Sequence, residues 1–545
     1  MNEKGLIAYY KQSFQENKDF QVFSDYEGIS YTYGDAAKLI YQIHGFFEQC
    51  QLKKGDKVAL FGRNSSHWGI TFLATISYGA VAVPVLPDFN PADVHHIVKH
   101  SESKLLFAAD QLFEKLDLAE MNGLQAVISL QRMDPVWAKT TEILNFWRLP
   151  NTSRPPFSTD IFMPVELEDE DICVISYTSG TSGFTKGVIL PARSLKSNIR
   201  FAREHMPLKQ GDQIVSFLPM AHVFGLLFEF LFPVTLGCHI TFLTKPPTPQ
   251  IIVKAFKEVK PHLILSVPLV IEKIYNKQIQ PALEKPLMSF LLKVPGINTL
   301  LHRKVKQKLV ETFGGRFYEI VIGGAALNRE VEDFFRKIKF PFTIGYGMTE
   351  CGPLISYQSW DKTRPHSAGK LVDQLQLKID SADPYNEVGE IMVKGDHVMA
   401  GYYKNPEATA QTIDEDGWLR TGDLGITDPN NFIYIRGRSK NMLLGPSGQN
   451  IYPEEIEAKL SSQHFIQECV VVDRDGKLVA LVFPDYECLQ IHHHSKPEDI
   501  SRIIDDYRLK VNKELAKYSQ ISKIELVETE FEKTPKRNIK RYLYT

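Results

Sequence analysis

The segment Tyr177–Gly187 restricts the fold of this chain more than any other part of the sequence. Its eleven residues include three glycines, five serine or threonine residues and one lysine, and it follows the apolar run Ile172–Ile175. A buried strand that ends in such a loop presents backbone N–H groups, hydroxyl donors and one cation, a set that suits a polyphosphate. A flexible linker is the alternative, but linkers rarely follow a β-branched apolar strand or contain a lysine between glycines.

The loop matches neither of the two common nucleotide fingerprints. A Walker A loop has four residues between its glycines and a serine or threonine directly after its lysine. Here two residues separate Gly180 from Gly183, and a glycine follows Lys186. The run Gly345–Gly347 begins like a dinucleotide fingerprint, but Glu350 stands where the third glycine belongs. The chain is therefore predicted to bind a nucleotide in another way.

Length and charge set the class of protein. A chain of 545 residues exceeds one small core, so two or more domains are expected. The net charge of −2 excludes a global basic field, so we expect no nucleic-acid partner. The six cysteines lack CxxC spacing, and Met1 is followed by polar residues and not by an apolar signal segment. Both observations favour a cytoplasmic protein.

The most apolar stretch, Phe217–Leu243, contains two histidines, a glutamate and two prolines. A membrane span needs about 20 mostly apolar residues with few charges. We therefore predict that this stretch is buried core that also lines a pocket, and we expect no transmembrane segment.

Strand and helix patterns alternate through the first half of the chain. The apolar runs Val58–Phe61, Val81–Val85 and Leu105–Ala108 are separated by helical patterns, which predicts layered α/β subdomains. Shorter strands from Val388 onward predict a β subdomain.

A basic, glycine-containing joint follows the β subdomain, at Arg436–Lys440. The remaining residues have the size of a separate domain. We therefore predict an α/β protein with a large N-terminal domain over residues 1–436, a hinge over residues 437–440 and a small mobile α+β domain over residues 441–545.

Six motifs resemble, in order, those of the AMP-forming adenylating enzymes, a family that includes acyl-CoA synthetases, adenylation domains and luciferases. They span nearly the whole chain. They are Tyr177–Gly187, Leu218–His222, Gly323–Leu327, Gly345–Glu350, Gly417–Asp423 and Gly437–Lys440. The resemblance is closest to the bacterial long-chain fatty acid–CoA ligase branch. It implies that a carboxylic acid is activated with ATP and Mg²⁺ as an acyl-adenylate, and that the acyl group then passes to coenzyme A.

The resemblance also implies a role for each motif. Lys186 and the loop residues would neutralise the β- and γ-phosphates and draw off pyrophosphate. Glu350 would hold Mg²⁺, which prefers carboxylate oxygen, and Thr349 would support the α-phosphate. The loop residues are Thr178, Ser179, Gly180, Thr181, Ser182 and Gly183. The other nucleotide-binding residues are Gly324, Ala325, Ala326, Tyr346, Gly347, Met348, Thr349, Asp423 and Arg438.

Several of these residues have a specific expected contact. Asp423 suits the two ribose hydroxyls, because an ionised carboxylate has two acceptor oxygens. Arg438 would complete the ribose-binding end of the nucleotide site. Tyr346 is expected to stack on adenine. His222 is expected to close the acyl pocket near the carboxylate, although a histidine among apolar residues is often a core residue that acts only in packing.

The second half of the reaction needs a movement. A thiol must reach a carbonyl that the first half keeps covered, and the family solves this by swinging the small domain about a hinge, here at Lys440. Gly448 would let the pantetheine arm of coenzyme A pass close to the backbone.

One departure from the family concerns a catalytic lysine near the C-terminus. The family has a lysine after a Thr-Pro pair and two further residues, and this chain has Asn538 at that position, after Thr534-Pro535-Lys536-Arg537. In an extended segment Lys536, Asn538 and Lys540 share one face, so either lysine is a candidate substitute. We predict Lys540.

The acid and the acceptor are less constrained. Val267–Tyr275 resembles the long-chain branch, so a medium- to long-chain fatty acid is expected, although Leu269 replaces a common arginine. The stretch Pro286–Leu309 interleaves apolar residues with lysine and arginine. Such a segment rests on the inner surface of an anionic membrane, as a peripheral contact, or packs as an ordinary helix.

Two alternatives to the fatty acid–CoA ligase stay open. The first is an enzyme that loads an acyl or aryl acid onto an acyl carrier protein. The second is a catalytically impaired paralogue that only binds nucleotide or acyl chain, a hypothesis that rests on Asn538.

Overall fold

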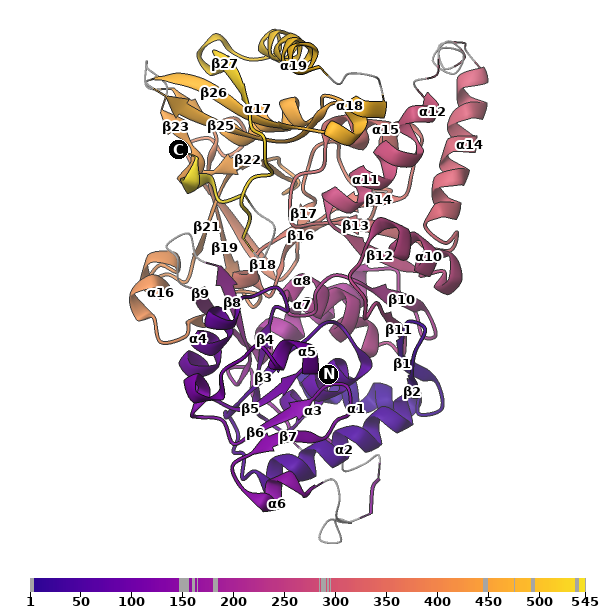
Figure 1. The fold of residues 1–545 in the computed structure, drawn as a ribbon, viewed down its shortest axis with the longest axis vertical. Helices are drawn as coiled ribbons and strands as arrows, with labels where there is room; N and C mark the ends of the chain where they lie inside the picture. Colours follow the sequence, from indigo (N-terminus) through magenta and orange to yellow (C-terminus); the bar gives the residue numbers. More distant parts are fainter. Residues whose placement is uncertain are drawn as a thin grey trace.

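An eight-stranded sheet lies at the centre of the N-terminal half of the chain (Figure 1). The computed structural model describes residues 4–146, 156–158, 162–163, 165–179, 185–283, 285, 291, 294, 296–444, 449–474, 476–491, 496–534 and 539–544. The sheet order is β20-β9-β8-β4-β3-β5-β6-β7; the run from β8 to β6 is parallel, and β20, β9 and β7 are antiparallel to their neighbours. The strands are β3 Lys57–Phe61, β4 Val81–Val85, β5 Ser103–Ala108, β6 Ala126–Ser129, β7 Pro135–Ala138, β8 Ile172–Ser179, β9 Thr185–Pro191 and β20 Gly401–Tyr402.

Different helices cover the two faces of this sheet. Val58 of β3 belongs to a core that includes α2 (Tyr33–Gln49) and α3 (Ser66–Ser77). Ala59, the next residue, belongs to a second core with α4 (Pro91–Ser101). Because side chains alternate along a strand, a sheet that is covered on both faces requires uninterrupted apolar strands such as β3.

Two smaller sheets extend the N-terminal half, one in the order β10-β11-β1-β2 and one, fully parallel, in the order β12-β13-β14. Their strands are β1 Gln21–Asp25, β2 Ser30–Thr32, β10 Gln213–Ser216, β11 His239–Phe242, β12 Leu263–Ser266, β13 Glu319–Ile322 and β14 Phe342–Ile344. The longer helices around them are α1 Leu6–Glu16, α7 Ala192–His205, α10 Pro249–Val259, α11 Pro268–Gln278, α14 Ile297–Thr312 and α15 Arg329–Lys337. Shorter ones are α5 Asp110–Phe113, α6 Thr141–Leu144, α8 Val223–Gly225, α9 Phe232–Val234 and α12 Gln280–Leu283, with a π-helical turn at Leu226–Leu231.

Antiparallel strands follow β14 in the order of the chain. They form the sheets β15-β16-β17 and β18-β19-β21-β22, and α16 (Pro406–Thr412) leads into β21. The strands are β15 Tyr346–Gly347, β16 Leu354–Tyr357, β17 Lys370–Leu371, β18 Leu375–Asp380, β19 Gly389–Gly395, β21 Leu419–Thr427 and β22 Ile433–Arg438.

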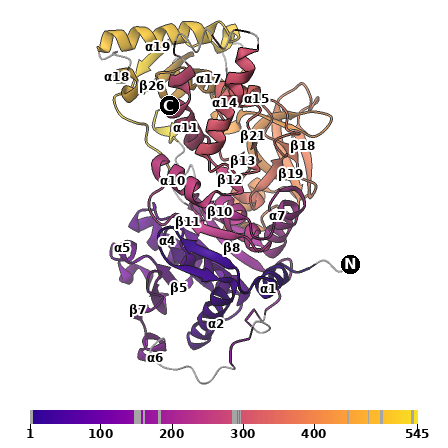
Figure 2. The same ribbon diagram turned by 90° about the vertical axis from the view of Figure 1, so that its right-hand side faces the viewer.

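The C-terminal part builds its own core on the sheet β25-β26-β27. Helices α17 and α19 pack on one face of this sheet, and the segment that contains Phe531, Ile539 and Tyr544 packs on the other. The elements are β23 Leu443–Leu444, β24 Asn450–Ile451, α17 Pro453–Ser461, β25 Ile466–Arg474, β26 Lys477–Pro484, α18 Tyr486–Ile491, α19 Pro497–Asn512 and β27 Lys523–Leu526. Figures 1 and 2 show these elements at the end of the molecule opposite α2 and α6.

These sheets and helices confirm the predicted α/β class with a β subdomain and a small α+β part. The largest core ends at Ile433 and the C-terminal core begins at Ile451, so the hinge predicted over residues 437–440 lies between two separate cores. The apolar stretch Phe217–Leu243 is mostly buried within the N-terminal half. Among the described residues, no helix combines the length and the apolar character that crossing a bilayer requires.

Candidate functional site

The predicted phosphate loop joins two strands that pair with each other. In the antiparallel hairpin of β8 and β9, Thr178 lies opposite Lys186 and Ser179 lies opposite Thr185. Four predicted residues of the loop tip, Gly180, Thr181, Ser182 and Gly183, lie outside the described residues. Because the chain returns as a strand, a hairpin positions Lys186 and Thr178, whereas a P-loop places its lysine at the start of a helix.

Lys186 faces an aromatic ring from a third strand. Its Nζ atom lies 4.8 Å from the centroid of the Tyr402 ring. Tyr402 is brought there because it pairs with Val188 of β9, two residues beyond Lys186. The Tyr402 hydroxyl donates a hydrogen bond to Glu350 Oε1 at 2.9 Å. Tyr402 therefore contacts two predicted site residues, Lys186 and Glu350.

Glu350 reaches this position from the sheet β15-β16-β17. It lies in the one-turn helix Thr349–Cys351, and its backbone carbonyl accepts a hydrogen bond from the N–H of Met399 at 2.8 Å. Mg²⁺ is commonly bound through one or two carboxylates together with substrate phosphates. The half-buried Glu350 carboxylate, close to Lys186 and Tyr402, fits that description.

Asp423 defines the other end of the site. It is 5% exposed, and its two carboxylate oxygens have different partners. Oδ2 accepts a hydrogen bond from the Tyr346 hydroxyl at 2.6 Å, and Oδ1 lies 2.9 Å from Arg438 Nε. Strand register explains the second contact, because Asp423 of β21 pairs with Arg438 of β22. Burial raises the pKa of Asp423, and the Arg438 charge opposes that shift.

The structure thus brings Tyr346, Asp423 and Arg438 together, as the predicted nucleotide site requires. The Tyr346 side chain is 8% exposed and tied to Asp423, so its ring edge lies beside the residue that is predicted to hold the ribose. Stacking of Tyr346 on adenine stays a prediction. A ribose that bonds both Asp423 oxygens would share the carboxylate with Tyr346 and Arg438 or displace them.

The predicted adenine turn lies where two parallel strands end. Residues 324–326 follow β13 and are exposed, and Gly324 has a φ of +89°, which favours glycine. The N–H of Gly345, after β14, donates to the carbonyl of Ile322 at 2.9 Å. The Gly323–Leu327 turn and the Gly345–Glu350 motif therefore lie side by side at the carboxyl ends of the strands, the usual binding position in open α/β sheets.

Gly347 in the second motif has no room for a side chain. A Cβ atom there would lie 2.1 Å from the carbonyl oxygen of Pro353. Met348, the next residue, donates from its N–H to that same carbonyl at 2.9 Å. The close approach of β15 and β16 therefore requires glycine at this position.

His222 lies at the start of α8 and is partly exposed. Its N–H donates to the carbonyl of Pro219 at 2.9 Å, which closes the turn of the Leu218–His222 motif. Its expected position beside the acyl carboxylate stays a prediction.

Two buried residues that the sequence did not predict hold the segment before His222. Glu229 Oε2 accepts hydrogen bonds, each 3.0 Å long, from the Ser216 hydroxyl and from the N–H groups of Phe217 and Leu218. Asn64 Nδ2 donates to the carbonyl of Leu218 at 2.7 Å. The one sequence signal was the presence of a glutamate within an otherwise apolar stretch.

Glu229 is fully buried in the π-helical turn Leu226–Leu231. Burial raises the pKa of its carboxyl well above the usual range, against the effect of its three donors. Oε1 has no hydrogen-bond partner among the described residues. π-Helical turns occur often at functional sites, and this one fixes the backbone next to the predicted acyl pocket.

The predicted hinge residue Lys440 lies in the one-turn helix Ser439–Asn441. The Ser439 hydroxyl donates to the carbonyl of Gly422 at 3.1 Å, and Asn441 Nδ2 donates to Glu454 Oε1 at 2.6 Å. Gly448, predicted at the coenzyme A channel, lies outside the described residues. The segment of the predicted hinge thus contacts both the Gly417–Asp423 motif and α17.

The contacts of Lys540 in the structure are with Glu532 of the last segment of the chain. Lys540 Nζ lies 3.3 Å from Glu532 Oε2, and Lys540 N donates to the carbonyl of Glu532 at 2.8 Å. The next residue, Arg541, pairs with the buried Glu457 of α17. Lys536 and Asn538 lie outside the described residues. In this arrangement Lys540 belongs to the small domain, and its role as the substitute lysine stays a prediction.

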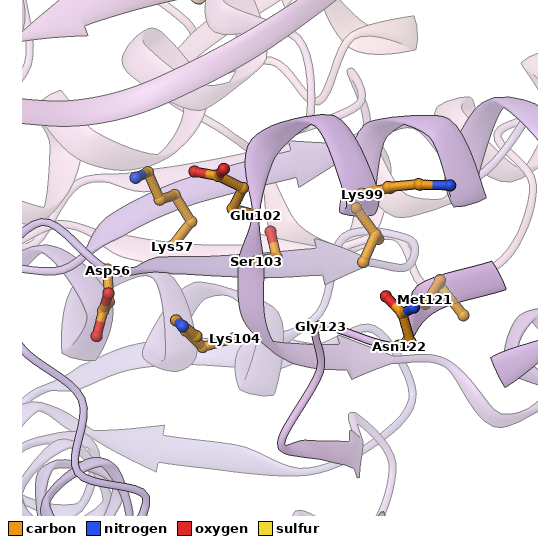
Figure 3. A pocket seen from close by; sticks show the side chains of 10 residues that line it. Asp56, Lys57, Lys99, Glu102, Ser103, Lys104, Met121, Asn122 and Gly123 are labelled. Carbon is orange, nitrogen blue, oxygen red and sulfur yellow. The ribbon is translucent and has the colours of Figure 1, made fainter. Parts of the chain in front are cut away.

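A surface hollow of about 500 Å³ lies elsewhere (Figure 3). Lys57 and Lys104 line it at the amino ends of β3 and β5, with Glu102 and Asn122 nearby. The phosphate loop follows the carboxyl end of β8, which is parallel to β4 and β3, so this hollow is not part of the candidate site.

Comparison with known proteins agrees with this geometry. Residues 10–403 match the family described as AMP-binding enzyme, and residues 441–544 match the AMP-binding enzyme C-terminal domain. A long-chain-fatty-acid–CoA ligase, FadD15 of Mycobacterium bovis, is 29% identical over 465 residues, which are 81% of this chain and 74% of that protein. The 4-coumarate–CoA ligase 1 of Arabidopsis thaliana is 27% identical over 520 residues, 92% and 85% of the two chains.

Solved structures share the fold over nearly the whole chain. The anthranilate CoA ligase AuaEII in complex with anthranoyl-AMP superposes with a TM-score of 0.79 at 19% identity, covering 99% of this chain and 96% of that one. A fatty acyl CoA synthetase of Mycobacterium tuberculosis superposes with a TM-score of 0.67 at 21% identity, covering 99% and 97%. At these identities the likeness confirms the predicted fold, and the roles of individual residues stay predictions.

Replacing Glu229 with glutamine is expected to change how stability depends on pH. The folded wild-type chain keeps a proton on Glu229 that the unfolded chain loses above a pH of about 4.3, so this residue lowers the free energy of unfolding as the pH rises, by up to about 1.4 kcal/mol per pH unit. Glu229→Gln keeps an acceptor for the three donors and has no proton to lose. Urea unfolding at about pH 6 and pH 8 measures the difference.

The exposed Glu204 provides the control, because Glu204→Gln should leave the pH dependence of unfolding as it is in the wild-type chain. Parallel pH dependences for wild-type and Glu229→Gln chains would show that Glu229 is ionised in the folded state, contrary to the prediction.

Proposed function

The chain belongs to the AMP-binding enzyme family, and from this membership we propose that it activates a fatty acid with ATP and transfers the acyl group to coenzyme A. In the first step a carboxylate oxygen attacks the α-phosphorus, the bond to the β-phosphate oxygen breaks, and acyl-AMP and pyrophosphate form. In the second step the thiol sulfur of coenzyme A attacks the acyl carbon, AMP leaves, and the thiol proton is released.

One observation supports this proposal most directly. Two groups of residues have complementary chemistry: Lys186 and Glu350, which both contact Tyr402, and Asp423 with Tyr346, which share a hydrogen bond. The two groups are close enough for the Glu350 charge to help raise the pKa of Asp423. The first pair offers a cation and a metal-binding carboxylate for a polyphosphate. The second offers acceptor oxygens for ribose hydroxyls. Motifs about 240 residues apart in the sequence are thereby brought to one site.

Each residue is proposed to stabilise charge at a defined atom. Lys186 neutralises the leaving pyrophosphate, and Thr349 donates to the α-phosphate as its negative charge shifts. Mg²⁺, when bound through Glu350, neutralises the phosphate oxygens. Asp423 and Arg438 hold the ribose so that the α-phosphorus stays in line with the incoming carboxylate. His222 is proposed to lie on the acyl side of that phosphorus.

A fatty acid is the proposed substrate class. The similarity to a protein named long-chain-fatty-acid–CoA ligase and the segment Val267–Tyr275 both favour it. The similarity to a protein named 4-coumarate–CoA ligase makes an aryl acid the second candidate. Coenzyme A is the proposed acceptor, since both relatives are named as coenzyme A ligases; an acyl carrier protein is the alternative.

Release of AMP with a panel of acids tests the proposal. We expect AMP and pyrophosphate with saturated fatty acids of about 8 to 18 carbons and coenzyme A, and much less with 4-coumarate, because the acyl pocket buries apolar area. Asp423→Asn should lower the rate roughly 10- to 100-fold at subsaturating ATP, since it weakens hydrogen bonds between a charged group and the ribose.

Asp416→Asn, an exposed position shortly before β21, serves as the matched control and should keep the wild-type rate. AMP release with carrier protein but not with coenzyme A would reassign the acceptor. No AMP with any acid would favour an impaired paralogue and exclude the proposed function.

Lys540→Ala tests the substitute for the lysine that the family has at Asn538. We expect acid-dependent ATP–pyrophosphate exchange to fall roughly 100-fold, because a cation between the carboxylate and the α-phosphate is lost, while transfer from preformed acyl-AMP to coenzyme A is unchanged. Lys536→Ala is the control and should leave both half-reactions intact. The reverse result, with exchange lost in the Lys536→Ala chain, would assign the role to Lys536.

A peripheral contact with an anionic membrane is proposed for α14. Figure 1 shows this helix at the outer edge of the molecule. Leu300 is 64% exposed and Ile297 is 38% exposed at its start, and Arg303, Lys304 and Lys308 on the following turns are exposed. Exposed apolar residues beside basic ones bind the interface of an anionic bilayer, where fatty acids partition.

Sedimentation with vesicles of phosphatidylglycerol and phosphatidylcholine, at about one part to three, measures this contact. Leu300→Glu should lower the bound fraction several-fold, whereas Leu509→Glu, at a position of α19 that is 48% exposed, should not. Equal binding of both variants and the wild-type chain would exclude α14 as the contact.

A further inference from the structure

Tyr402 occupies a position that neither the motifs nor the proposed reaction assign. Its hydroxyl donates to Glu350 Oε1 at 2.9 Å, and Lys186 Nζ lies 4.8 Å from the centroid of its ring. We propose that Tyr402 is a positioning residue that keeps the Lys186 ammonium and the Glu350 carboxylate as two separate charges, one for the phosphate oxygens and one for Mg²⁺. This inference rests on the proposed function of the site.

The backbone around Tyr402 holds the side chain in a fixed place. Tyr402 pairs with Val188 of β9, and the N–H of the next residue, Tyr403, donates to the carbonyl of Gly187 at 2.7 Å. The Tyr402 N–H donates to Thr409 Oγ1 at 2.9 Å. The side chain is 8% exposed, so few rotamers are open to it. Its ring is thus held by β20, which pairs with β9, the strand that follows the phosphate loop.

The hydroxyl of Tyr402 directs the carboxylate of Glu350. A carboxylate has two acceptor oxygens, and a donor that occupies one of them orients the other. A tyrosine hydroxyl keeps its proton at neutral pH, so the Tyr402 hydroxyl is a donor to the carboxylate. Ligands to metals are usually held in this way by a hydrogen bond from a neighbouring group.

The ring of Tyr402 restrains Lys186 without neutralising it. A cation over an aromatic face is attracted by the ring quadrupole but keeps its charge and its donors. In the part of the chain that the structure describes, no ion pair joins Lys186 to Glu350, although both contact Tyr402. A direct ion pair between Lys186 and Glu350 would occupy both charges, and polyphosphate and metal would then have to break this ion pair in order to bind.

This arrangement predicts that removing the hydroxyl of Tyr402 and removing its ring have different effects on Glu350 and Lys186. Tyr402→Phe removes the hydroxyl and keeps the ring, so it should disturb Glu350 and leave Lys186 in place. Tyr402→Leu removes both, so Lys186 and Glu350 should pair with each other. Tyr403→Phe is the matched control, because the Tyr403 hydroxyl lies 3.4 Å from Glu102, outside the site.

Equilibrium binding of ATP at varied Mg²⁺, and of pyrophosphate without metal, measures these effects independently of turnover. In Tyr402→Phe the Mg²⁺ concentration for half-maximal ATP binding should rise about 3- to 10-fold, with metal-free pyrophosphate binding within about twofold of wild type. In Tyr402→Leu the Mg²⁺ concentration for half-maximal ATP binding should also rise, and metal-free pyrophosphate binding should be weaker by about tenfold. Tyr403→Phe should match the wild-type chain.

A second substitution separates positioning from a structural effect. In the chain with Tyr402→Leu and Glu350→Gln together, Lys186 has no carboxylate to pair with, so metal-free pyrophosphate binding should return to within about threefold of wild type. A purely structural defect would not be rescued. Failure of this rescue, or an unchanged Mg²⁺ requirement in Tyr402→Phe, would overturn the proposal.

Failure of the proposal for Tyr402 can be distinguished from failure of the proposed function. A wild-type chain that binds ATP with Mg²⁺ but forms no AMP with any acid contradicts the function and leaves the test of Tyr402 intact. A wild-type chain that binds neither ATP nor pyrophosphate overturns both.

Discussion

The pairing of β9 with two neighbours at once is the interaction on which the candidate site depends. On one side β9 pairs with β8, which places Lys186 opposite Thr178; on the other it pairs with β20, which places Tyr402 beside Lys186. Residues more than 200 positions apart thereby become neighbours through backbone hydrogen bonds. Because backbone pairing fixes register, small shifts in side chains elsewhere do not move this group. Glu350 is then tied to β20 through Tyr402, and to the residues just before β20 through the N–H of Met399.

The nucleotide end of the site is organised before any ligand enters. Asp423 has partners on both oxygens, and Tyr346 and Arg438 come from different strands to reach it. A carboxylate buried to this degree needs such partners to stay ionised. A ribose that binds at Asp423, as proposed, would share or exchange these hydrogen bonds, a cheaper process than desolvating a free carboxylate at that moment.

The sequence predicted the parts of the site that lie in short glycine-rich motifs, because backbone geometry there restricts the residue type. Gly324 and Gly347 show this restriction directly. It predicted the α/β class from apolar runs such as β3, which need cover on both faces. It did not predict Tyr402, Asn64 or Glu229, whose roles follow from contacts between distant segments. A tyrosine after a glycine, or a glutamate in an apolar stretch, is compatible with many structural roles until the pairing of strands is known.

The packing of the last segment on its own sheet has a consequence for how the reaction is timed. Phe531, Ile539 and Tyr544 lie on the face of β25 and β26, and Arg541 is anchored to Glu457. If the substitute lysine lies in this segment, the rotation of a whole folded body about Lys440 delivers it. The charge needed for the first step would then leave with the same motion that admits the thiol for the second. Solvent viscosity slows large rotations and leaves local side-chain motions nearly unchanged. A higher viscosity would then lower the rate of the complete catalytic cycle.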